Sequence, residues 1–213
     1  DAGMPLRERR PEMGTCIGIN FDFETTDFHL RWALYDLGPS LYEASHSELP
    51  YDEWFVTVQD ALSRPLNATS TVGSLGGIVG SRVAKEFLLG GPSFVVSAEE
   101  ASGLRALEVA ARALQQGEVD AALVGAVDLT GDIRQLLQRH VEGAYTSSSK
   151  CLPFDVRADG TLPGDAAVAL VLKRYDDALA DQDHIYSVFR GVGFASGSDQ
   201  ASFVPNVQAC EAA

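Results

Sequence analysis

The sequence has few cysteines, few cations and no long apolar run. Its three cysteines, Cys16, Cys151 and Cys210, lack CxxC spacing and are too few for a disulfide framework. Sixteen basic against 30 acidic residues give a net charge of −14, so nucleic acid and anionic membranes, which bind basic patches, are not expected partners. No apolar stretch is long enough to span a membrane, and no signal-peptide core is present. We therefore expect a cytoplasmic protein.

Several motifs that would mark a cofactor or metal site are also missing. The four histidines are scattered over the chain without zinc-binding spacing and include no HExxH motif: His29, His46, His140 and His184. The glycines between Gly73 and Gly80 are not followed by the Lys-Ser/Thr of a phosphate loop, so close helix packing explains them better. No GxSxG elbow of a serine hydrolase occurs either. The sequence predicts no bound cofactor and no metal.

The residues that are present predict a layered α/β fold. At 46% hydrophobic and 22% charged residues the composition is that of a globular protein with a sizeable core. Apolar spacing predicts strands at 14–20, 93–97, 120–128, 165–173 and 185–195, and helices from Asp27 to about residue 34 and over 51–62, 71–88, 102–116, 133–140 and 175–180. Residues 36–50 and 147–165 are expected to be loops. Strands that alternate with helices indicate a largely parallel or mixed sheet.

One junction between these elements stands out chemically. The strand that begins at Ser93 runs through Glu99 and Glu100 directly into the helix that begins at Ser102. A strand-to-helix turn presents backbone N–H groups and the positive end of the helix dipole. The two glutamates have a structural explanation, electrostatic stabilisation of the first helical turn, and a functional one, the position of a catalytic group. The residues alone leave both open.

Around this junction the chain resembles the β-ketoacyl synthase (ketosynthase) family of fatty acid and polyketide synthases. Segments that are similar to the family occur in the family's order: Gly91–Val96, Gly103–Asp120, Ala121–Val127, Cys151–Asp155 with Ala158–Gly160, Gly164–Ala167, Val171–Arg174, and Ala178–Tyr186 with Arg190-Gly191. The resemblance implies a thiolase-like layered αβαβα fold. It also implies that residues 1–213 form an incomplete, N-terminal and central portion of a ketosynthase-like domain, without its C-terminal half.

The departure from the family pattern concerns the nucleophile. Ketosynthases carry a cysteine in an Asp-Thr-Ala-Cys-Ser-Ser turn at the helix start, where the helix dipole favours the thiolate. Counting without gaps from Gly91 forward, or from Leu104 back, places Glu100 at that cysteine position. The two family histidines belong to the half that this chain lacks. We expect no condensation by the usual covalent route.

Three functions fit the resemblance. The favoured one is a non-condensing subunit, like a chain-length factor of polyketide or polyunsaturated fatty acid synthases, that pairs with an active ketosynthase or a second copy. A decarboxylating domain that acts on malonyl-carrier protein and a purely structural module that contacts other synthase domains are the alternatives. In the family the strand before the catalytic turn pairs across a two-fold axis, which makes Phe94, Val95 and Val96 the predicted dimer contact.

The resemblance also implies acyl substrates carried on the phosphopantetheine arm of acyl carrier protein. An acidic carrier protein could contact basic side chains on the predicted helices, and three lie there: Arg82, Lys85 and Arg105. Solvated helix faces explain these cations equally well. No carrier site is assigned.

Overall fold

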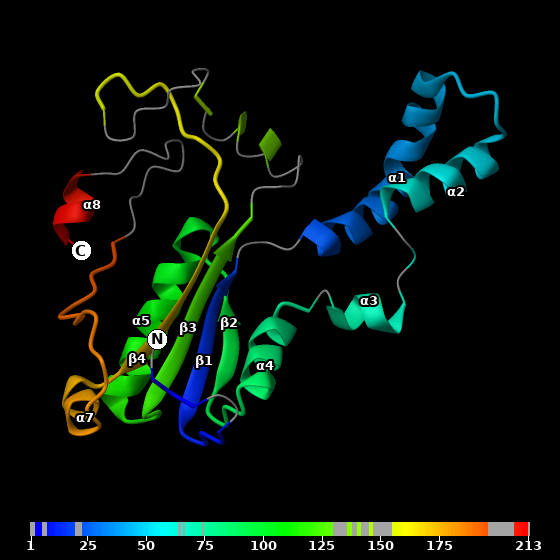
Figure 1. Cartoon of the computed structure of the whole chain (residues 1–213). Helices are drawn as coiled ribbons and strands as arrows, with labels where there is room; N and C mark the ends of the chain where they lie inside the picture. Colours follow the sequence, from blue (N-terminus) through cyan, green and yellow to red (C-terminus); the bar gives the residue numbers. More distant parts are fainter. Residues whose placement is uncertain are drawn as a thin grey trace.

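The structure is a computed structural model, which describes residues 3–5, 8–19, 23–63, 65, 67–73, 75–129, 136–137, 140–141, 145–146, 155–195 and 207–212. Its strands are β1 (Met13–Ile19), β2 (Ser93–Val96), β3 (Ala121–Asp128) and β4 (Ala166–Lys173). Its helices are α1 (Phe23–Ser45), α2 (Tyr51–Leu62), α3 (Ala68–Gly73), α4 (Gly77–Glu86), α5 (Ser102–Gln116), α7 (Tyr175–Ala180) and α8 (Val207–Ala212), with a 3-10 turn η1 (Glu99–Ala101) before α5. Figure 1 shows their arrangement.

The four strands form one mixed sheet in the order β2-β1-β3-β4. β1 pairs in parallel with β2, opposing Thr15 to Ser93, and with β3, opposing Thr15 to Leu123. β4 pairs antiparallel to β3, opposing Val171 to Leu123. Because β1, β2 and β3 run in the same direction, their carboxyl ends meet at one edge of the sheet.

Helix α5 covers one face of this sheet. Its apolar residues recur at three- and four-residue spacing, so they form one face of the helix, and Gly117 ends it in a left-handed conformation (φ +73°). The buried residues between helix and sheet are mostly small: Ala106, Ala110 and Leu114 from α5, with Cys16, Ala122 and Val124 from the strands. Ala106 is fully buried, at 0% exposure. Small side chains bring the helix close to the sheet.

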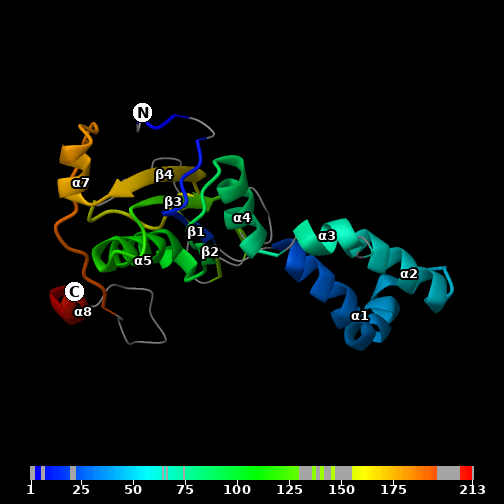
Figure 2. The same ribbon diagram turned by 90° about the horizontal axis from the view of Figure 1, so that it is seen from below.

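Helix α4 lies against the opposite face, over β1 and β2. A Cβ added at Gly80 would lie 3.2 Å from Ser93 Oγ and 3.3 Å from the carbonyl oxygen of Phe94, so glycine permits this close approach. Figure 2, which looks along the sheet, shows α5 and α4 on its two sides. In the part of the chain that the structure describes, α5, the sheet and α4 are three successive layers of a layered α/β fold.

Arg174, which follows β4, joins the far end of α5 to β3 and α7. Its Nη1 donates hydrogen bonds to the carbonyl oxygens of Leu114 (3.2 Å) and Val119 (2.8 Å). Its Nη2 donates to Asp120 (2.7 Å), and its Nε to Asp177 (2.5 Å). One guanidinium therefore caps the carboxyl end of α5 and fixes the start of β3.

Helices α1 and α2 form an antiparallel hairpin that stands clear of the sheet in both views (Figures 1 and 2). They pack through aromatic rings: the ring centroids of Tyr42 lie 5.3 Å from those of Tyr51 and 5.2 Å from those of Trp54. Tyr35 adds a contact with Phe55 at 5.0 Å. Arg31 donates to the Gln59 carbonyl (2.9 Å) and pairs with Asp60 (2.9 Å), which ties the open end of the hairpin.

Most predicted elements match the structure. The strands β1 to β4 each lie within one residue of prediction, and α2, α5 and α7 have the predicted bounds. The predicted helix 133–140 and much of the predicted loop 147–165 lie outside the described residues. The sheet is mixed, as expected.

Four predictions were wrong. α1 begins at Phe23, so Asp27 is not its N-cap, and it continues through Pro39 to Ser45 across the predicted loop. The predicted helix 71–88 is divided into α3 and α4, with Gly76 as the N-cap of α4. Residues 185–195, predicted as a strand, have no regular secondary structure and no ladder partner among the described residues. α8 was not predicted at all.

The physical reasons lie in tertiary contacts. Downstream of Pro39, ring packing of Tyr42 on α2 keeps the chain helical despite the lost N–H group. At 185–195 the apolar alternation is present, but a strand also needs a neighbour to accept its hydrogen bonds.

Candidate functional site

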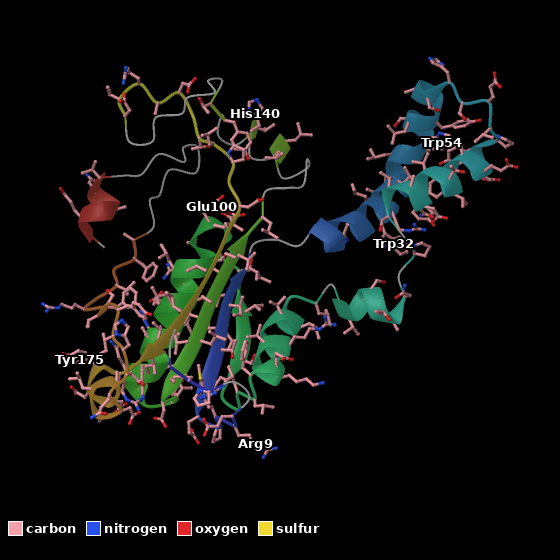
Figure 3. All side chains as sticks on the ribbon, in the orientation of Figure 1. Arg9, Trp32, Trp54, Glu100, His140 and Tyr175 are labelled. Carbon is pink, nitrogen blue, oxygen red and sulfur yellow. The ribbon has the colours of Figure 1, made fainter. Side chains whose placement is uncertain are left out.

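The turn between β2 and α5 lies at the edge of the sheet toward which β1, β2 and β3 run. β2 ends at Val96, the 3-10 turn η1 carries Glu99 and Glu100, and α5 begins at Ser102. Both glutamate side chains are exposed. Figure 3 labels Glu100 at this end of α5, beside the tips of the strands. The turn therefore presents a carboxylate at the edge of the mixed sheet where the three parallel strands end.

Ser102 holds the turn closed. Its Oγ accepts a hydrogen bond from the Ala98 backbone N–H (2.8 Å) and donates one to the Glu99 carbonyl oxygen (2.6 Å). The Ala101 N–H donates to the Ala98 carbonyl oxygen (3.0 Å). The Ser102 side chain is buried, and the bonds span the residue pair that bears the two acids. A short buried hydroxyl thus fixes the backbone of the turn that carries Glu100.

Two glycines let the start of α5 lie directly on the sheet. A Cβ added at Gly18 of β1 would lie 2.6 Å from the backbone of Ser102 and Gly103. A Cβ added at Gly103 would lie 2.8 Å from the Cβ of Ala126 on β3. Real Cβ atoms do not make such contacts, so this end of α5 sits as close to the sheet as backbone allows.

Glu99 has a backbone conformation that is unusual for a residue with a side chain. Its φ is +51°, in the left-handed region, which favours glycine. Ser102 contacts the carbonyl oxygen of this same residue, so the hydroxyl supports the strained conformation. Glu99 and Glu100 add negative charge where the helix dipole is positive, which stabilises the first turn of the helix. Both explanations of the acids therefore remain compatible with the geometry.

Cys16 cannot replace a missing nucleophile. It lies in the middle of β1, under α5, with 3% of its surface exposed. Burial raises the pKa of its thiol to about 11, so it stays protonated at neutral pH. A buried, protonated thiol of this kind is a poor nucleophile. Cys151 and the Cys210 side chain lie outside what the structure describes.

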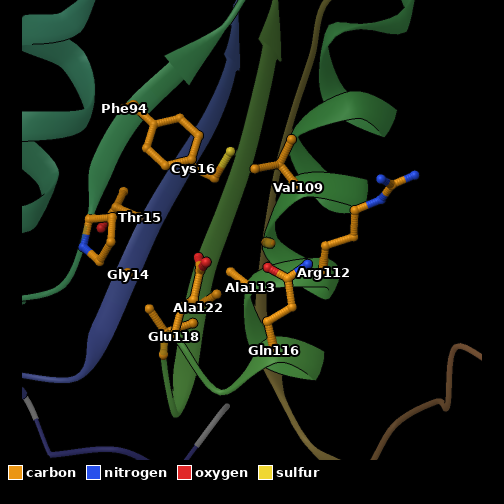
Figure 4. Close-up of a pocket in the computed structure, with 13 residues that line it drawn as sticks. Gly14, Thr15, Cys16, Phe94, Val109, Arg112, Ala113, Gln116, Glu118 and Ala122 are labelled. Atoms are coloured by element: carbon orange, nitrogen blue, oxygen red, sulfur yellow. The ribbon is translucent and has the colours of Figure 1, made fainter.

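The predicted dimer residues lie on a strand at the edge of the sheet. β2 is the end strand of the order, paired with β1 on one side. Phe94 is 39% exposed, while Val95 and Val96 are partly buried. In Figure 4 the Phe94 ring, the Cys16 thiol and the Val109 side chain approach one another from β2, β1 and α5, at the wall of a cavity of about 200 Å³. No residue of the Glu99–Ala101 turn lines it, so the cavity is separate from the Glu100 site.

The three cations that were considered for carrier protein are not brought together into one patch. Arg82 and Lys85 are exposed on α4, on the opposite face of the sheet from α5. Arg105 pairs with Glu108 (2.7 Å), and its guanidinium lies 4.1 Å from the centroid of the Phe194 ring. That contact ties the extended segment 183–195 to α5.

Other site types find little support in the described residues. His46 is exposed, and His140 and His184 contact Tyr145 and Tyr186 through their rings, at 6.1 and 4.4 Å. Across the part of the chain that the structure describes, no three His, Cys, Asp or Glu side chains converge as metal ligands. No helix in these same residues has the length and apolarity to cross a membrane.

Comparison with known proteins identifies the family. The family described as "Beta-ketoacyl synthase, N-terminal domain" matches residues 1–178. The chain belongs to the β-ketoacyl synthase family. Its described part has the thiolase-like fold: a ketosynthase from module 1 of the bacillaene synthase of Bacillus amyloliquefaciens FZB42 superposes with a TM-score of 0.65 at 26% identity, over 93% of this chain and 30% of that one.

Curated relatives of this ketosynthase domain are polyketide synthases. The phthioceranic/hydroxyphthioceranic acid synthase of Mycobacterium tuberculosis is 39% identical over 120 residues, 56% of this chain and 6% of that protein. A mycocerosic acid synthase-like polyketide synthase of Mycolicibacterium smegmatis is 37% identical over 131 residues, 62% of this chain and 6% of that protein. The ketosynthase domain thus spans a small part of the relatives it matches.

The sequence alone did not predict the hydrogen bonds of Ser102 or the close contact of Gly18 with α5. Ser102 was interpreted only as the start of a helix, and Gly18 only as part of a buried strand. The useful signal was the pair Gly18 and Gly103, since glycine in a strand and at a helix start often marks a close backbone approach.

Proposed function

We propose that this ketosynthase domain does not condense acyl groups itself and assists acyl chain elongation by pairing with an active ketosynthase. The observation that carries the proposal is Glu100, which lies in the strand-to-helix turn at the position that the family resemblance assigns to the nucleophilic cysteine. The described turn offers no thiol, and the nearby buried thiol of Cys16 stays protonated.

The chemistry of a carboxylate supports this proposal. Attack of Glu100 on an acyl thioester would form a mixed anhydride and release a thiolate, and the anhydride is the more reactive of the two acyl compounds. Its formation is therefore uphill, and water would hydrolyse it in this exposed turn. A neutral side chain at this position would suit decarboxylation better, because it could donate a hydrogen bond, which a carboxylate cannot.

The edge of the sheet is the proposed pairing surface. β2 ends the strand order, and Phe94 is half-exposed beside the cavity between β2, β1 and α5. An edge strand offers backbone hydrogen bonds to a neighbouring chain, and the cavity offers room for an apolar side chain of that chain. The proposed partner is an active ketosynthase or a second copy. Acyl groups would arrive on the phosphopantetheine arm of acyl carrier protein, in the cytoplasm and without a cofactor bound to this domain.

Substitution at position 100 tests the proposed role. In the intact synthase, Glu100→Ala is expected to leave product formation unchanged, and Glu100→Cys is expected to gain acyl loading from an acyl-carrier protein, detected by mass spectrometry of the intact protein. Glu118→Cys, an exposed glutamate beyond the far end of α5, is the matched control and should not load. Loss of decarboxylation of malonyl-carrier protein in Glu100→Ala would instead establish the decarboxylating alternative.

Light scattering tests the pairing. Phe94→Asp places a charge on the proposed contact and is expected to convert a dimer, or a complex with an active ketosynthase, into separate chains. Leu104→Asp, a similarly exposed apolar residue on α5, is the control. An unchanged mass for Phe94→Asp would contradict the proposed surface and favour the purely structural module.

A further inference from the structure

Ser102 is the first residue of α5, but its side chain bonds backward into the turn. The Ala98 N–H donates to Ser102 Oγ at 2.8 Å, and Oγ donates to the Glu99 carbonyl oxygen at 2.6 Å. A capping serine would instead precede the helix and accept a hydrogen bond from an N–H group of the first helical turn. The N-cap position of α5 belongs to Ala101. The hydroxyl of Ser102 therefore acts on the turn and not as a cap of the helix.

The atom that Ser102 holds leads directly to residue 100. The Glu99 carbonyl oxygen accepts two hydrogen bonds from Ser102, one from the backbone N–H and one from Oγ. This oxygen and the N–H of Glu100 belong to one planar peptide unit, so fixing the oxygen orients the bond that enters residue 100. Glu99 has a φ of +51°, a left-handed conformation that a residue with a side chain keeps only when its surroundings hold it. The two bonds from Ser102 hold it there.

The position of Ser102 is in turn set by the sheet. A Cβ added at Gly18 would lie 2.6 Å from the carbonyl carbon and oxygen of Ser102, so the Cα of Gly18 lies against the backbone of this residue. Gly18 belongs to β1, an inner strand that is paired with β2 and β3. Ser102 is buried in this contact. A continuous series of contacts therefore runs from an inner strand, through Ser102, to the peptide that enters residue 100.

We propose that Ser102 is a positioning residue, whose hydroxyl holds the strained turn and thereby sets the geometry of residue 100. The inference rests on the proposed function in one respect, that residue 100 is the chemical position of the turn. The contacts are made by backbone atoms of residues 98–102 and by one hydroxyl, so the same geometry is available to glutamate and to cysteine at residue 100. It also follows that residues 99 and 102 are coupled, because the hydroxyl is needed where residue 99 is not glycine.

A thiol introduced by Glu100→Cys reports this geometry without any acyl chemistry. Its alkylation by iodoacetamide is measured against pH in the whole chain, by mass spectrometry of the peptide that carries residue 100, which separates it from the three native cysteines. The rate follows the thiolate form, which a helix N-terminus favours. Adding Ser102→Ala is expected to slow alkylation at neutral pH about fivefold and to raise the midpoint of the pH profile. Adding Ser81→Ala is the matched control, because Ser81 Oγ makes the same kind of bond on α4, to the Gly77 carbonyl oxygen (3.0 Å).

Glycine at residue 99 distinguishes positioning from a general loss of stability. Because glycine adopts a φ of +51° without strain, Glu99→Gly should restore at least about half of the rate that Ser102→Ala removes. Glu99→Gln removes the same charge and keeps a side chain, so it is the control and should leave the rate low. An unchanged pH profile in Ser102→Ala, or equal restoration by Glu99→Gly and Glu99→Gln, would overturn the proposal.

The proposal is also tested if Ser102→Ala alone prevents folding. Circular dichroism should then show that Glu99→Gly/Ser102→Ala folds and that Glu99→Gln/Ser102→Ala does not. Any other pattern would overturn the proposal, since relief of strain at residue 99 would not replace the hydroxyl. Failure of the proposed function gives a different result: Ser102 controls alkylation, and the thiol introduced by Glu100→Cys gains no acyl group.

Discussion

The sheet region and the α1–α2 hairpin are built on opposite packing rules. Between α5 and the sheet most contact residues are small, and the Cα of Gly18 on β1 lies against the backbone of α5. In the hairpin the contacts are aromatic rings whose centroids lie 5.0 to 6.0 Å apart. At Gly18 and Gly103 the first region leaves no room for one extra carbon atom. The second region leaves large side chains such as Trp32, at 60% exposure, in water.

The two kinds of packing differ in how firmly they hold the residues that they carry. Close backbone contact fixes the start of α5, and hence the turn with Glu100, because any displacement produces a clash. Ring contacts tolerate small shifts, and they leave amphipathic edges that suit a partner surface. The proposed chemical position at Glu100 therefore lies in the closely packed region.

The largest effect is expected from a substitution at the close contact between β1 and the start of α5. Gly18→Val places a branched side chain into the backbone of Ser102 and Gly103, so we expect the free energy of unfolding to fall by about 4 kcal/mol. Urea denaturation measures it. Gly77→Ala is the control, because a Cβ there meets nothing within 4 Å and alanine favours the helix; it should raise the free energy of unfolding slightly. A Gly18→Val protein as stable as the unaltered chain would mean that α5 can move off the sheet.

A second substitution tests whether the hairpin unfolds on its own. Trp54 is the buried ring of the hairpin, and Trp54→Ala should cost about 3 kcal/mol of local stability through the cavity it leaves. Hydrogen exchange should then show lost protection in α1 and α2 with unchanged protection in β1 and β3. Trp32→Ala, at the exposed position, is the control and should change little. Loss of protection throughout the sheet would contradict the separation of the two regions.

The last effect appears only at high pH and concerns the buried thiol in the closely packed region. Because burial raises the pKa of Cys16 to about 11 from an ordinary value of 9.0, the folded chain keeps a proton that the unfolded chain releases. Stability from this group is complete below pH 9 and declines as pH rises toward 11, by about 3 kcal/mol in all. The difference in unfolding free energy between the unaltered chain and Cys16→Ala should therefore shrink over this range. A constant difference would show that the thiol is not desolvated.

Elements with strong local signals were predictable from the sequence. α5 matched its prediction because its apolar residues repeat at helical spacing and Gly117 ends it. β3 matched because an unbroken apolar run indicates a strand buried on both faces. In contrast, Pro39 and the serines around it indicate a loop locally, and only the rings of α2 keep that segment helical.

The candidate site divides in the same way. Glu100 was predictable because strand and helix signals border it closely on both sides. The bonds of Ser102 and the contact of Gly18 with α5 were not, since they join residues whose relation depends on the fold. The exposed apolar residues Leu37 and Leu41 of α1 were missed because residues 36–50 were expected to be a loop.

By itself the sequence determined the family, the order of strands and helices in the sheet region, and the place of Glu100 between a strand and a helix. These depend on residue type and short-range periodicity, which the chain carries without folding. Only the tertiary structure decided that α5 lies on glycine, that Cys16 is a protonated thiol, and that a 23-residue helix with an internal proline stands clear of the sheet. Those features depend on distances between residues far apart in the chain, and packing alone sets them.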